Sequence, residues 1–212
     1  VLAGVLMGAA GSAWAQTYVL RGDGVEVAVD AQGNLASLKN TRTGHDYAAG
    51  RPLWRLYFDR KDGEKEIPVA GAENVPRVEQ ASDKIVLSYG ALKSRGTELQ
   101  MRLTLTLRIE DGLVRFGSEV SNSEPHTVIR ELHYPLVGAC RLEAGDRLLT
   151  TFAGGQLFAD PVKRIVAVGN NPPYMAPSQY YRQMDLKYPS HTWGNCFAFV
   201  GGRQGLYLGS QI

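Results

Sequence analysis

Cysteine and histidine are scarce in this chain of 212 residues. There are two cysteines, Cys140 and Cys196, and four histidines, and none of them has the spacing of a zinc motif. Two cysteines alone do not complete a tetrahedral zinc site, so neither a metal nor a cofactor is expected. In an oxidising compartment the two cysteines could pair or stay separate buried thiols. Pairing requires that their Cα atoms lie within about 7 Å, which the sequence does not reveal.

The sequence also lacks the short motifs of common enzyme classes. It has no G-x-S-x-G elbow, no Walker loop, no H-E-x-x-H helix and no EF-hand loop. Its 23 basic and 21 acidic residues are interspersed rather than gathered in blocks. No basic stripe is visible along the chain, which argues against a nucleic-acid partner and against an anionic membrane surface.

Helical periodicity is missing as well, whereas alternation with a period of two residues is common. From Glu98 to Phe116, apolar residues alternate with polar ones, and Asp111-Gly112 provides a tight turn. Similar runs occupy 25–29, 52–58, 85–89 and 128–136, and two more flank Gly201-Gly202. Many short strands with turns between them predict an all-β, antiparallel β-sandwich with little helix.

The first fifteen residues have the features of a secretory signal. Residues 1–11 are apolar or small and carry no charge, and Ala13-Trp14-Ala15 supplies the small-x-small pattern of a cleavage site. The apolar run is shorter than the roughly 20 residues that cross a membrane, so no membrane span is expected. We predict a signal peptide over 1–15 without its charged leader, a mature start near Gln16, and a secreted or periplasmic bacterial protein. The alternative is a buried N-terminal helix.

Two groups of residues are candidates for function. Glu131 and His133 lie two apart on an expected strand and therefore share a face, where they could act as an acid/base pair. The alternative is an ordinary polar pair on a solvated sheet. The second group is aromatic and polar, as in sites where sugars stack on rings. Its members, which could equally be core or interface residues, are Tyr188, His191 and Trp193.

Three segments, in order, resemble one known domain family. They are DAQGNLASLKNTRTGHDY at 30–47, RIEDGLVRFGSEVSNSEPHTVIRELHYPLVG at 108–138, and KYPSHTWGNCFAFVGGRQGLYLGSQI at 187–212. Together they resemble the N-terminal galactose-mutarotase-like supersandwich of secreted bacterial glycoside hydrolases that carry a C-terminal (β/α)8 barrel. The resemblance covers roughly residues 24–212.

The resemblance implies a β-sandwich domain over 16–212, cut before a missing catalytic barrel. Hydrolysis of a glycosidic bond needs two flanking carboxylates, and in this family they lie in the barrel. The expected function is therefore a non-catalytic module of an exported carbohydrate-active enzyme, which packs on the barrel and contacts the glycan through Tyr188, His191 and Trp193. The alternatives are a self-contained mutarotase-like or lyase-like enzyme, with Glu131 and His133 as its acid/base pair, and a stand-alone carbohydrate-binding sandwich.

Overall fold

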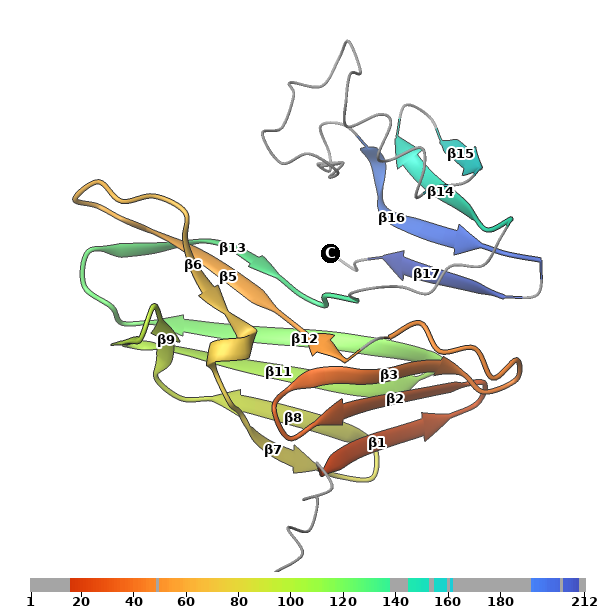
Figure 1. The fold of residues 1–212 in the computed structure, drawn as a ribbon, viewed down its shortest axis with the longest axis horizontal. Coiled ribbons are helices and arrows are strands. Elements are labelled where there is room, and N and C mark those ends of the chain that lie inside the picture. Colours follow the sequence, from red (N-terminus) through yellow and green to blue (C-terminus); the bar gives the residue numbers. More distant parts are fainter. Residues whose placement is uncertain are drawn as a thin grey trace, which may run out of the picture. The chain divides into compact units, whose positions relative to one another are not determined.

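The structure, a computed structural model, describes residues 16–48, 50–137, 145–152, 155–159, 161, 192–202 and 204–209 (Figure 1). Strands are the main regular secondary structure of this part of the chain, and their pairings are antiparallel. A short 3-10 helix, η1, spans Gly71–Glu73. The prediction of an all-β, antiparallel fold is confirmed. Residues 1–15, for which a signal peptide is predicted, lie outside the described residues.

The described residues belong to two compact units. The first comes from residues 1–38 and 49–138, and the second from residues 39–48 and 139–212. A single β-sandwich domain over 16–212 stays a prediction.

The largest sheet of the first unit has the strand order β12-β11-β8-β7. Its strands are β7 Arg77–Gln80, β8 Lys84–Tyr89, β11 Met101–Glu110 and β12 Leu113–Asn122. The predicted turn joins β11 to β12, with Glu110 opposite Leu113. Asp111 and Gly112 have φ of 52° and 72°, the left-handed conformation that a two-residue hairpin turn requires.

Alternation along this sheet buries one of its faces. Leu103, Leu105 and Leu107 of β11 have no exposed surface, and neither do Ile85 and Leu87 of β8. Since successive side chains of a strand point to opposite faces, the residues between them form the outward face. The buried face is the centre of the first unit's hydrophobic core.

Smaller sheets supply the rest of this core. Their strands are β1 Thr17–Gly22, β2 Val25–Asp30, β3 Asn34–Asn40, β4 Arg51–Pro52, β5 Arg55–Arg60, β6 Ile67–Ala70, β9 Leu92–Ser94, β10 Thr97–Leu99 and β13 Thr127–His133. A Cβ on Gly22 of β1 would overlap the Ile109 side chain of β11, so these strands pack closely. The Gln80 amide further ties β7 to β1, because Nε2 donates to Val19 O at 2.8 Å.

The second unit contains a sheet of strand order β15-β14-β16-β17. Its strands are β14 Arg147–Phe152, β15 Gln156–Ala159, β16 Thr192–Val200 and β17 Gly205–Gly209. The predicted pair of strands around Gly201-Gly202 is confirmed. Among the described residues there is no helix of the length and apolarity that crossing a bilayer requires.

Substitutions at two glycines of the first unit allow the cost of backbone strain alone to be compared with the cost of strain plus steric overlap. Gly33 and Gly96 both have a φ of 79°. A Cβ on Gly96 would meet nothing within 4 Å, whereas one on Gly33 would overlap the Tyr89 hydroxyl and approach Pro76 Cγ to 3.1 Å. We expect Gly96→Ala to cost about 1 kcal/mol of unfolding free energy, because a non-glycine residue is disfavoured at this φ.

We expect Gly33→Ala to cost about 1 kcal/mol more than Gly96→Ala, because the neighbouring ring must shift to make room. Urea denaturation of both variants measures the difference. Equal destabilisation would show that Tyr89 and Pro76 do not confine this turn.

Candidate functional site

The candidate site lies on the sheet of order β13-β5-β6 in the first unit (Figure 1). Leu56 and Phe58 of β5 point into the core, with 0% and 1% of their surface exposed. Arg55 and Tyr57 therefore point to the opposite, solvent-facing side. On β13, Glu131 pairs with Tyr57 and His133 pairs with Arg55. These four residues, Arg55, Tyr57, Glu131 and His133, are called the polar-aromatic face below.

A β-bulge in β13 sets this register. Ile129 pairs with Phe58 and Glu131 with the next residue of β5, Tyr57, so Arg130 is the extra residue. The guanidinium of Arg130 reaches along the sheet to Asp59, with Nη1 3.2 Å from Oδ2. The bulge thus adds a charged residue to β13 and still leaves Glu131 beside the tyrosine ring.

The four side chains of the polar-aromatic face contact one another. His133 Nε2 lies 2.9 Å from Glu131 Oε2. The rings of Tyr57 and His133 have centroids 5.3 Å apart and are tilted by 58°. Arg55 Nη1 donates to the Tyr57 hydroxyl at 3.2 Å. The face therefore consists of one phenol ring bordered by three planar polar groups.

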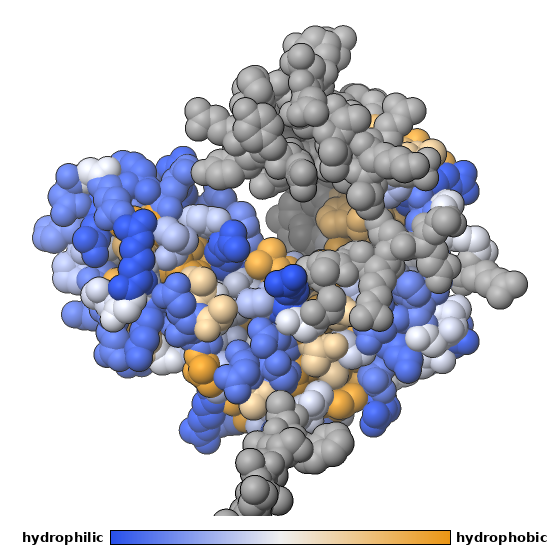
Figure 2. Space-filling model, viewed as in Figure 1, coloured by the Kyte–Doolittle hydropathy of each residue, from blue (hydrophilic) through white to orange (hydrophobic). Residues whose placement is uncertain are grey.

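The polar-aromatic face is open to solvent. The side chains of His133 and Glu131 expose 41% and 53% of their surface. Figure 2 shows hydrophilic residues dominating the left of the molecule, where Figure 1 places the turns that join β5 to β6 and β12 to β13, beyond this face. A ligand could therefore reach the ring and the histidine–glutamate pair without any rearrangement of the core.

A further carboxylate on this side of the sheet, that of Asp59, is already engaged. Its Oδ1 accepts a hydrogen bond from the Glu66 backbone N–H at 2.9 Å, and Oδ2 accepts from Arg130. The Glu66 N–H, followed by the charges of Arg130 and Lys65, holds the pKa of Asp59 below its usual value. Asp59 therefore anchors the turn that follows β5 and is not available as a second catalytic carboxylate.

The other predicted site residues are not brought to this face. Tyr188 and His191 lie outside the described residues, and so does Cys140. Trp193 belongs to β16 in the second unit, and its side chain is outside the description. Cys196, on the same strand, is half-buried. The roles of Tyr188, His191 and Trp193, and the pairing of the cysteines, stay predictions.

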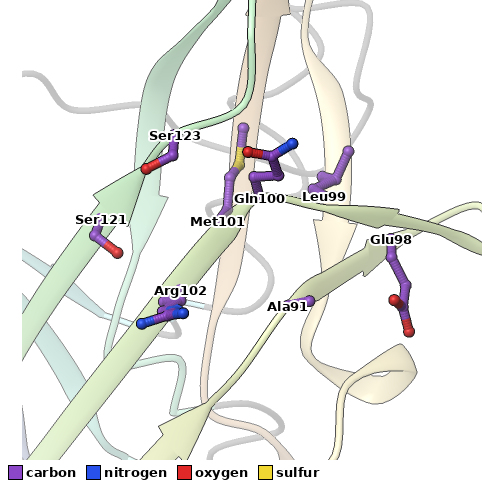
Figure 3. Close-up of a pocket in the computed structure, with 8 residues that line it drawn as sticks. All are labelled: Ala91, Glu98, Leu99, Gln100, Met101, Arg102, Ser121 and Ser123. Carbon is purple, nitrogen blue, oxygen red and sulfur yellow. The ribbon is translucent and has the colours of Figure 1, made fainter.

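A hollow of about 520 Å³ lies at the other end of the first unit, where β10 meets β11 and β12 (Figure 3). Its polar lining comes from Glu98, Gln100, Arg102, Ser121 and Ser123. Its lining includes no aromatic ring and no histidine, so neither serine has an imidazole there to activate it as a nucleophile. No cluster of histidine, cysteine and carboxylate groups suited to a metal occurs in the part of the chain that the structure describes.

These features define an all-β protein of antiparallel sheets with an exposed polar-aromatic face. No protein-family model, curated protein or solved structure matches the chain.

Proposed function

We propose that this chain is a non-catalytic, carbohydrate-binding β module of an exported glycoside hydrolase, and that the polar-aromatic face contacts the glycan. The observation that supports the proposal is the position of the half-buried Tyr57 ring, which lies on the solvent-facing side of the sheet and is bordered by Arg55, Glu131 and His133. Sugar rings stack their C–H faces on aromatic rings, and planar polar side chains fix the hydroxyl groups around them.

The same face argues against hydrolysis of a glycosidic bond by this module alone. Both hydrolytic mechanisms need two carboxyl groups with access to one bond. Glu131 is open to solvent, but the oxygens of Asp59 accept bonds from Glu66 and Arg130. A single solvent-exposed carboxylate, paired with a histidine, suits binding better than cleavage.

Binding of neutral oligosaccharides tests the proposal. Calorimetric titration of the full chain with cellohexaose, xyloglucan and galactan oligosaccharides should identify at least one ligand. We expect Tyr57→Ala to weaken binding of that ligand about tenfold, or 1.4 kcal/mol, because the stacking surface is lost. Tyr57→Phe should retain most of the affinity, because it keeps the ring.

Tyr207→Ala provides the matched control, since Tyr207 of β17 is 63% exposed and lies in the second unit. The affinity of the Tyr207→Ala variant for the ligand should equal that of the unaltered protein. A Tyr57→Ala variant that binds as tightly as the Tyr207→Ala variant would refute the binding role of the polar-aromatic face.

A second candidate function is mutarotase-like acid/base catalysis, and one distance favours it. His133 Nε2 and Glu131 Oε2 are 2.9 Å apart, within the reach of proton transfer. Such an enzyme would accelerate the change in optical rotation of freshly dissolved galactose, and Glu131→Gln would abolish the acceleration. A rate equal to that of buffer alone would eliminate this candidate and leave the binding proposal intact.

A further inference from the structure

Three basic side chains lie side by side on neighbouring strands of the large sheet. Arg108 of β11 pairs with Arg115 of β12 on one side and with Lys84 of β8 on the other. Figure 1 shows these strands as neighbours. Because neighbouring strands are about 4.8 Å apart, the three residues form a row across the sheet about 10 Å long. Like charges directly opposite each other destabilise a sheet, so this arrangement has a cost in the free protein.

The charges of this row are incompletely neutralised within the first unit. Neither Lys84 nor Arg108 forms an ion pair or side-chain hydrogen bond with any residue that the structure describes. Arg115 Nε lies 3.8 Å from Glu110 Oε2, which is too far for a hydrogen bond. That nitrogen is also shielded from solvent and has no hydrogen-bond partner in the described chain. The row therefore has a single carboxylate for three cations.

The same outward face continues along β11 to the hollow of Figure 3. Arg102, which lines the hollow, is six residues from Arg108 and therefore about 20 Å away along the strand. Two threonines, Thr104 and Thr106, lie between them on this face, and neither is fully buried. Two carboxylates lie along this stretch: Glu119 is opposite Thr104, and Glu79 of β7 is in the row of Thr106 and forms an ion pair with Arg77. The face thus offers cations at both ends and hydroxyl groups between them.

We propose that this outward face, with Lys84, Arg108 and Arg115 at one end and Arg102 at the other, binds an anionic polysaccharide. A polyuronate carries a planar carboxylate on each sugar ring, and an arginine guanidinium matches a carboxylate with two parallel hydrogen bonds. The threonine hydroxyls suit the ring hydroxyls between the charges. This site goes beyond the proposed function because it lies on a different sheet and involves neither Tyr57 nor His133.

The composition of this face favours a polysaccharide over a nucleic acid. None of its outward positions carries an aromatic side chain. These positions are 77 and 79 on β7, 84, 86 and 88 on β8, 102, 104, 106, 108 and 110 on β11, and 113, 115, 117, 119 and 121 on β12. Proteins that bind single-stranded nucleic acid stack its bases on aromatic rings. Charge and hydroxyl contacts without stacking fit a polyuronate chain.

Binding of polygalacturonate to the full chain tests this inference, with dextran as the neutral polymer. At about 50 mM NaCl we expect polygalacturonate to bind and dextran to bind at least tenfold more weakly, and we expect about 500 mM NaCl to remove the difference, since salt screens exposed charges. Arg108→Gln should lower the affinity for polygalacturonate at least tenfold. Lys61→Gln, an equal charge change at an exposed turn residue, should leave that affinity within twofold.

A second measurement separates binding from folding. Because Arg108 faces two like charges, Arg108→Gln should keep or raise the Tm of the free protein at low salt, whereas loss of a structural residue would lower it. The inference is overturned if Arg108→Gln binds polygalacturonate as the unaltered protein does, or if dextran binds equally well. Tighter binding of single-stranded DNA or of phosphatidylserine vesicles than of polygalacturonate would also overturn it. Neutral oligosaccharide binding at Tyr57 is measured separately, so failure of one site does not decide the other.

Discussion

Replacement of Leu105 by alanine is expected to remove about 3 kcal/mol of unfolding free energy from the first unit, within the range of 2–5 kcal/mol for large-to-small changes in a core. Leu105 has no exposed surface and lies on β11 between Leu103 and Leu107, which are also fully buried. The strand has neighbours on both sides, β8 and β12, so the surroundings cannot easily collapse into the cavity. Urea denaturation followed by circular dichroism measures the change.

The adjacent residue provides the control. Thr104 points to the outward face of the same strand, so Thr104→Ala should cost no more than about 1 kcal/mol, the span of strand propensities. Hydrogen exchange of the β8 and β11 amides should speed up in Leu105→Ala and not in Thr104→Ala. Similar losses in both variants would mean that the face of β11 which contains Leu105 is not the centre of the core.

The folded protein is expected to lose stability steeply between pH 10 and about 12. Burial raises the pKa of Tyr89 to about 12 from its usual value of 10.0, and burial also raises the pKa of Tyr134 strongly. In the unfolded chain both phenols ionise near pH 10, whereas in the folded protein they stay protonated. Unfolding then releases protons, so the free energy of unfolding is complete below pH 10 and falls as the pH rises.

For Tyr89 the loss amounts to about 3 kcal/mol by pH 12, since each pKa unit corresponds to about 1.4 kcal/mol. Urea titrations at pH 7, 10 and 12 measure it. Tyr89→Phe should remove this part of the pH dependence, because phenylalanine has no proton to release. If Tyr89→Phe shows the same alkaline loss as the unaltered protein, the titrating group is a different one.

The parts of the fold that were predictable depend on local pattern. Alternation in β11 and the Asp111-Gly112 turn together determine the pairing of β11 with β12. That hairpin alone places Arg108 opposite Arg115. The position of Lys84 opposite Arg108 was not predictable, because it depends on the pairing of β8 with β11, and β9 and β10 lie between them in sequence. A chain with interspersed charges can therefore form a basic row on a sheet.

The candidate site was predictable in the same limited way. The spacing of Glu131 and His133 indicates a shared face, and the structure confirms their contact at 2.9 Å. Tyr57 was not connected with them, since β5 and β13 are far apart in sequence and pair only in the folded sheet. The alternation of residues 52–58 could have shown that Tyr57 and Arg55 lie on one side, but not which strand lies beside them.

The bulge at Arg130 also determines how the length of this strand could change during evolution. Ile129 and Glu131 face consecutive residues of β5, so the pairing on either side of Arg130 is already continuous without it. Deletion of this one codon would leave Glu131 opposite Tyr57 and His133 opposite Arg55. Deletion elsewhere within β13 would exchange the two faces of the strand on one side of the gap. Arg130 is thus the place in β13 where a homologous chain could be one residue shorter and keep the same surface.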